Sequence, residues 1–171
     1  MGTLNAIYIR SAVPIETIDA NWPTAYTEPG SGFFAIDLPS DHFDCPSDRL
    51  AALSGVLNTD VLWITFQSAA DAFAYHHWKS GYLQRSLEHG MLEQGIWEKV
   101  EGETEPWERE AFFQPRQLAR LLEDADSEQE RTTTRRLFDE QILELGNWLP
   151  MVDARESARA IADHYALPGW Q

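Results

Sequence analysis

Three histidines with a potential for chemistry lie in the middle of the chain, at His76, His77 and His89. Histidine is the most common protein metal ligand and the side chain that most often changes charge near neutral pH. His76 and His77 are adjacent in a segment with strand character, so they point to opposite faces and cannot bind the same ion. No cysteine or carboxylate stands at a spacing typical of zinc sites. The pattern favours ordinary sheet histidines, and we predict no metal site.

Nucleophilic catalysis would need an activated thiol or hydroxyl, and the sequence has one cysteine, Cys45. His42 is close to it, but the loop that contains Pro46 offers no helix amino terminus to lower the pKa of the thiol. The sequence contains neither a Gly-x-Ser-x-Gly motif nor a glycine-rich phosphate loop. We therefore predict no catalytic residue and no cofactor.

Carboxylates are too common here to indicate catalysis, since 28 of the 171 residues are acidic. A group of them follows one edge of the predicted sheet: Glu88, Glu93, Glu98 and Glu101. Charged side chains are mostly exposed in folded proteins. This group is interpreted as a solvated sheet surface.

Arg85 is the charged residue that strand alternation places on an otherwise apolar face, opposite Tyr75. A buried arginine requires a carboxylate partner, because an isolated buried charge is costly. Asp37 or Asp71 could supply that carboxylate. We predict a core salt bridge, with anion binding as the alternative.

The aromatic residues of the predicted hairpin suggest a contact surface. We expect residues 79–81 to form a three-residue loop with positive φ at its glycine, which places Trp78 opposite Tyr82. One face of the hairpin then carries Phe73, Tyr75, His77, Leu83, Arg85 and Leu87, and the other carries Ala74, His76, Trp78, Tyr82, Gln84 and Ser86. The predicted contact residues are Trp78, Tyr82 and His76, joined by Trp97, and Arg85 is a further predicted binding residue.

Hydrophobic periodicity and turn residues predict the elements that position these side chains. Strands are expected over residues 4–10, 33–38 and 60–67, followed by an antiparallel meander over residues 72–101. Helices are expected over residues 14–22, from Ser47 to residue 57, from Pro115 to 122, from 128 to 145 and from 154 to 165. The predicted amino-terminal caps are Ser47, Ser127 and Asp153. A connecting arm over residues 103–108 is expected to anchor through Trp107.

The sequence therefore predicts an α+β fold with a mixed or antiparallel sheet of about six strands. We expect one domain over residues 1–171, with a sheet-forming part (1–101) and a helical C-terminal part (112–167). The C-terminal helices are expected to cover the face that carries Trp78 and Tyr82, because exposed aromatic surface is unfavourable.

Composition limits the classes of partner. The net charge is −15, so the chain lacks the basic stripe of a nucleic-acid binder, and anionic membranes are disfavoured. No signal peptide, no membrane-spanning segment and no possible intrachain disulfide are present in the sequence, which favours a cytoplasmic location.

Two functions are compatible with these observations. The first is a non-enzymatic interaction module, of the partner-binding or immunity type, that recognises a basic protein; tryptophan is enriched at such contacts. The alternative is a small-molecule binder or enzyme with a pocket between the sheet and the C-terminal helices, using His76 and Arg85.

Overall fold

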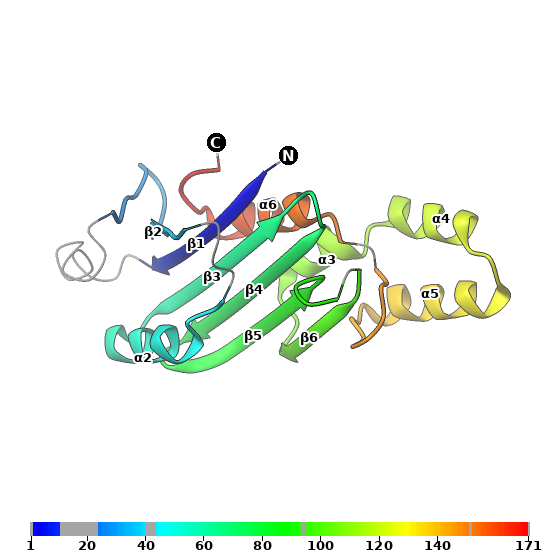
Figure 1. The fold of residues 1–171 in the computed structure, drawn as a ribbon, viewed down its shortest axis with the longest axis horizontal. Coiled ribbons are helices and arrows are strands. Elements are labelled where there is room, and N and C mark those ends of the chain that lie inside the picture. The colour runs from blue at the N-terminus through cyan, green and yellow to red at the C-terminus, as the bar shows by residue number, and fades with distance from the viewer. Residues whose placement is uncertain (1, 11–23, 40–43, 94, 151, 171) are drawn as a thin grey trace.

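The computed structural model describes residues 2–10, 24–39, 44–93, 95–150 and 152–170. The strands in these residues form one antiparallel sheet in the order β2-β1-β3-β4-β5-β6 (Figure 1). Their bounds are β1 Thr3–Arg10, β2 Phe33–Asp37, β3 Asp60–Gln67, β4 Ala72–Lys79, β5 Tyr82–His89 and β6 Trp97–Gly102. The predicted α+β class is confirmed, and the sheet is antiparallel rather than mixed. The helix predicted over residues 14–22 lies outside the described residues.

Most of the predicted helices are present. The caps predicted at Ser127 and Asp153 are confirmed, whereas Ser47 is the first residue of its helix and not its cap. Their bounds are α2 Ser47–Leu57, α3 Pro106–Phe112, α4 Pro115–Asp124, α5 Glu128–Glu140 and α6 Ala154–Tyr165. The Ser127 and Asp153 side chains each accept a hydrogen bond from the backbone of the first helical turn, which satisfies amide groups that have no partner within the helix. Asn58 ends α2 in a left-handed conformation.

Two helix boundaries differ from the prediction. Helix α5 ends at Glu140 rather than near residue 145, because Gln141 has φ of 54° and closes the helix before Gly146 is reached. The arm predicted over residues 103–108 contains the start of α3, with Pro106 at its first helical position. Trp107 is buried, as the predicted anchor requires.

The turn between β4 and β5 has two residues, not three. Ser80 and Gly81 both have positive φ (51° and 86°), the geometry of a tight hairpin, so Trp78 pairs with Leu83 instead of Tyr82. A bulge after His77 then shifts the register once more, and His77 pairs with Arg85. The two shifts add to an even number, so beyond the bulge Arg85 and Leu87 still share a face with His77 and Tyr75, as predicted. Leu83, between the turn and the bulge, pairs with Trp78 rather than with His77 as predicted.

Each face of the sheet has its own apolar core. Helices α3 and α6 cover the face that carries Tyr75 and Leu87, while α2 covers the face that carries Trp63 and Trp78 (Figure 1). The prediction that the C-terminal helices cover the Trp78 face is therefore wrong. The helix beside Trp78 is α2, whose Leu50 belongs to the same apolar core as Trp63 and Trp78.

Both edge strands have one additional backbone pairing. At the β2 edge, Tyr26 and Ala35 exchange two hydrogen bonds of 2.9 and 2.8 Å. At the β6 edge, Trp97 bonds to Gly146 and Asn147 at 2.8 and 3.0 Å. Helices α4 and α5 pack mainly against each other and extend beyond this side of the sheet (Figure 1).

Candidate functional site

The structure places three of the four predicted contact residues in the core. Trp78, His76 and Trp97 are 3%, 1% and 0% exposed, whereas Tyr82 is 75% exposed. Trp78 and His76 lie in the layer between the sheet and α2, where their rings are 5.5 Å apart. Their role in binding a partner stays untested, but in the folded protein Tyr82 is the member of this set that another molecule can reach.

Arg85 forms the predicted core salt bridge with a partner that the prediction did not name. Its Nε and Nη2 donate to both carboxylate oxygens of Glu108 in α3, at 2.8 and 2.6 Å, and Glu108 is fully buried. Arg85 Nη1 also donates to the Gly102 carbonyl at 2.9 Å. Neither Asp37 nor Asp71 is the partner, because α3 covers the face of the sheet on which Arg85 lies.

His77 is the centre of a second polar cluster on the same face. Its Nδ1 lies 2.6 Å from Oε1 of Glu105, and its Nε2 lies 3.0 Å from Oδ1 of Asp60. An ionised carboxylate can only accept hydrogen bonds, so a ring nitrogen that faces one must carry a proton. His77 is therefore held between two carboxylates, one at each ring nitrogen. Arg10 donates to the other oxygen of Asp60 at 2.7 Å.

Glu105 joins this cluster to the helices. Its Oε2 accepts hydrogen bonds from Tyr75 at 2.7 Å, Trp107 at 2.8 Å and Tyr165 at 2.9 Å. Its backbone N–H donates to the Glu108 carboxylate at 2.8 Å, which links the cluster to the Arg85 salt bridge. Strands β3 and β4 and helices α3 and α6 are thus connected through one side chain. We call Arg10, Asp60, Tyr75, His77, Glu105, Trp107 and Tyr165 the His77 network.

The protonation of the network follows from these contacts. Burial is the largest single influence and would raise the pKa of Asp60 and of Glu105. The hydrogen bond and charge of His77, together with Arg10 at Asp60 and with Tyr75 and Trp107 at Glu105, outweigh burial and hold the pKa of both carboxyls below the usual values. Burial, with the negative charge of Glu105 second, raises the pKa of Tyr75 and Tyr165 well above the usual value. Both tyrosines are therefore neutral donors to Glu105.

A pocket of about 460 Å³ opens beside the network, between the sheet and α6. Its lining includes His77, Glu105 and Tyr165 from the network, together with Lys79 and Glu103. This pocket differs from the predicted one, because its lining comes mainly from β4, β5 and residues 102–106, with Tyr165 from α6, and includes neither His76 nor Arg85. Both nitrogens of His77 and both carboxylate oxygens of Glu105 already have partners, which favours a rigid binding wall over proton transfer.

On the opposite face, His76 has a different environment. Its Nε2 lies 3.0 Å from Glu88 Oε1 and 3.4 Å from Ser86 Oγ, and its buried Nδ1 has no hydrogen-bond partner in the described part of the chain. A catalytic triad needs the serine and the carboxylate on different nitrogens of the histidine. Ser86, His76 and Glu88 do not have that arrangement, and Ser86 is fully buried.

The remaining candidates do not form a reactive centre. The prediction that no helix amino terminus lies near Cys45 is wrong, because α2 begins at Ser47. Burial nevertheless raises the pKa of the Cys45 thiol to about 11, and His42 lies outside the described residues. Within the described ranges, no group of three or more His, Cys, Asp or Glu side chains could hold a metal ion. Of the edge carboxylates, Glu98 accepts backbone hydrogen bonds from the 91–93 loop, while Glu88 and Glu101 flank Lys99 at 3.8 and 4.0 Å.

Sequence reasoning found His77 and Arg85 on the apolar face but missed their partners. The signal for one of them is present: Glu105 precedes a proline and stands three residues before Glu108, which is typical of a helix start. Asp60 gave no signal, because its proximity to His77 depends on the pairing of β3 with β4.

Comparisons with protein-family models, with curated proteins and with solved structures gave no match. Among the helices that the structure describes, none has the length and apolar character needed to cross a bilayer.

Proposed function

We propose that the protein is a non-catalytic, partner-binding module of the cytoplasm and that the turn between β4 and β5 is its contact surface. The observation that carries this proposal is Tyr82, a large aromatic side chain that is 75% exposed. Leu83 next to it is 40% exposed. Aromatic side chains dominate the binding energy of many protein interfaces.

The turn that carries Tyr82 is held against α2. The backbone N–H of Gly81 donates to Ser54 Oγ at 3.2 Å, and Ser80 N donates to the Thr59 carbonyl at 3.2 Å. Gly81 lies so close to Gly55 that a side chain at either position would crowd the other backbone. A fixed turn loses little conformational entropy when a partner binds, which favours affinity.

The same contact places a second apolar residue near the turn. Val56 directly follows Gly55 and is 83% exposed. We call Val56, Tyr82 and Leu83 the turn surface. Residues 115–140 hold five arginines and seven acidic residues, so the rest of the chain carries −13 of the net charge of −15. This charge would speed association with a basic partner and disfavour an acidic one.

The proposal is tested by capture of binding proteins on purified protein, with Tyr82→Ala compared with Leu92→Ala. Leu92 is 92% exposed in the loop after β5, so its replacement is a matched loss of exposed apolar surface at the other end of that strand. We expect one stoichiometric basic partner on the wild type and on Leu92→Ala, with at least a tenfold loss of affinity for Tyr82→Ala. Equal capture by both variants would exclude the turn surface.

The alternative function, small-molecule binding, is favoured by the pocket beside His77. Lys79 is exposed at its mouth and Tyr165 lies in its wall. A thermal-shift screen of small polar metabolites, repeated on Lys79→Met, tests this alternative. A ligand that raises the midpoint of the wild type but not of the variant would support it, and a screen without such a ligand would count against it.

A further inference from the structure

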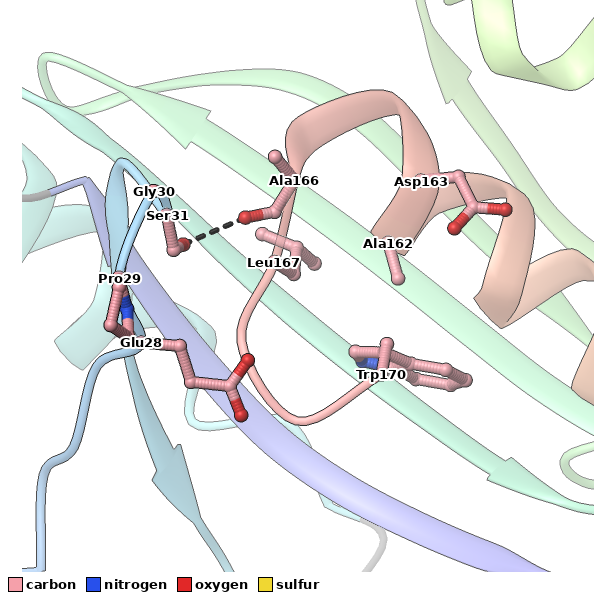
Figure 2. Close-up of a pocket in the computed structure, with 9 residues that line it drawn as sticks. All are labelled: Glu28, Pro29, Gly30, Ser31, Ala162, Asp163, Ala166, Leu167 and Trp170. Atoms are coloured by element: carbon pink, nitrogen blue, oxygen red, sulfur yellow. Dashed lines mark hydrogen bonds between the residues drawn. The ribbon is translucent and has the colours of Figure 1, made fainter.

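A second pocket, of about 360 Å³, lies where α6 ends, on the side of the molecule formed by β1 and β2 (Figures 1 and 2). Residues 28–31 form one wall, the last turn of α6 forms another, and Trp170 lies at the base. We propose that this pocket binds an alkyl ammonium or guanidinium group, the cations that end lysine and arginine side chains. The proposal does not depend on the turn surface.

The aromatic part of the pocket is fixed in position. Trp170 Nε1 donates to the Tyr8 hydroxyl at 2.9 Å, and the indole packs against Phe66 with ring centroids 6.2 Å apart. The polar edge of the indole is therefore occupied, while the ring remains part of the pocket lining. The π face of tryptophan attracts cations more strongly than that of any other side chain.

Two carboxylates belong to the lining of the same pocket as the indole. Figure 2 shows that of Glu28 beside the segment that leads to Trp170 and that of Asp163 on the last turn of α6, on the other side of the pocket. The carboxyl end of α6 adds partial negative charge, since the last carbonyl groups of a helix point out of its end. Asp163 also lies 3.9 Å from Arg159, but both side chains are well exposed, so this pair is weak and can rearrange around a ligand.

The two walls are tied together before any ligand binds. Ser31 Oγ donates to the Ala166 carbonyl at 2.7 Å, which joins the 28–31 segment to the cap of α6 (Figure 2). The carboxylates of the two walls are thus held across one opening rather than on separate mobile segments. A preformed site loses less entropy on binding.

The chemistry of the lining selects among ligands. Two carboxylates repel an anion, and a neutral apolar group gains nothing from them. A metal ion such as Mg²⁺ or Ca²⁺ needs six or more oxygen ligands, whereas an indole supplies none. An organic cation can interact with both the carboxylates and the indole. Its positive charge attracts the carboxylates, while its alkyl stem and charged head pack against the indole ring.

The test follows the Trp170 indole N–H by NMR, with the signal assigned by its loss in Trp170→Phe. The probes are n-butylammonium, ethylguanidinium, a capped Gly-Lys-Gly peptide and, as the neutral analogue, n-butanol. We expect saturable shifts with the cations and none with n-butanol. Tighter binding of the peptide would identify a protein side chain as the ligand, and tighter binding of the free cations would identify a small amine or guanidine.

The charge contribution is tested with the double variant Glu28→Gln, Asp163→Asn. Replacing both partly exposed carboxylates should weaken binding of n-butylammonium roughly three- to tenfold. Glu156→Gln, in the first turn of the same helix, is the control and should stay within about twofold. Unchanged affinity in the double variant, or equal binding of n-butanol, would overturn the proposal. On the wild type itself, binding that does not weaken as salt rises would also overturn it.

Discussion

His76 and His77 are neighbours in β4 and have the same side chain, yet the structure gives them opposite environments. His77 has a carboxylate on each ring nitrogen, whereas His76 has Glu88 on one nitrogen and no partner for the other in the described part of the chain. Strand alternation sends one ring toward α3 and α6 and the other toward α2. The comparison shows that the partners on each face, rather than the residue type, decide what a buried histidine does.

The largest expected effect comes from removing a carboxylate on the His77 side. Glu105→Ala should lower the free energy of unfolding by about 3–5 kcal/mol, because it removes one of the two carboxylates that contact His77 and the acceptor of three further donors. Glu88→Ala on the His76 side should cost about 1 kcal/mol, the value of one ordinary hydrogen bond. Urea denaturation measures both.

Glu103→Ala is the matched control for this comparison, since Glu103 is exposed and two residues from Glu105. Its effect should stay within about 0.5 kcal/mol. Similar losses of unfolding free energy for Glu105→Ala and Glu88→Ala would mean that the carboxylate contacts of His77 contribute no more to stability than those of His76.

Lowering the pH should weaken the contacts of Asp60 and Glu105 gradually, whereas Glu105→Ala removes the Glu105 contacts completely. The pKa of Asp60 and Glu105 is lower in the folded protein than in the unfolded chain, so the unfolded chain binds protons first as the pH falls. The stability that these carboxyls contribute is fully present above their ordinary values, 3.8 and 4.5, and is lost as the pH falls through the lowered folded values. Urea midpoints between pH 7 and 3 measure the loss.

The variant Glu105→Gln separates this contribution from the others. Its stability should change less with pH than that of the wild type, and the two curves should converge in acid. A loss of stability that begins near pH 6.5 is instead assigned to His89. Burial is the largest cause that lowers the pKa of His89 below its usual 6.5, so the unfolded chain binds this proton first as the pH falls. Parallel curves for wild type and variant between pH 5 and 3 would contradict the assignment to Glu105.

The smallest expected effect is a difference between the His76 and His77 rings that does not involve the free energy of unfolding. ¹⁵N NMR should show hydrogen bonds at both ring nitrogens of His77 but at Nε2 alone in His76, because Nδ1 of His76 has no hydrogen-bond partner in the described part of the chain. A ring nitrogen of His77 without a hydrogen bond would contradict this comparison.

The sequence was informative wherever the signal was local. Alternation in β4 and β5 correctly placed His77 and Arg85 on the apolar face, and Ser127 and Asp153 correctly marked helix starts. The tight Ser80–Gly81 turn and the bulge after His77 were missed, because two- and three-residue loops suit the same sequence and a bulge has no reliable signal here.

Long-range pairings could not be predicted from the sequence. Asp60 is 17 positions from His77 and Glu105 is 28 positions away, so their meeting depends on strand order and on the face that α3 covers. The same limit explains the burial of Trp78, His76 and Trp97. An aromatic, polar face of a hairpin gave no indication that α2, from an earlier part of the chain, would cover it.

The backbone pairings at the two sheet edges have a consequence for association between copies of this protein. An unpaired edge strand can accept another strand and start aggregation. Tyr26 already occupies part of the β2 edge, and Gly146 and Asn147 occupy the start of β6. The rest of β6 carries Glu98, Lys99 and Glu101, charges that an incoming strand would have to desolvate. Both edges of the sheet, β2 and β6, are therefore protected against the addition of a strand from another copy.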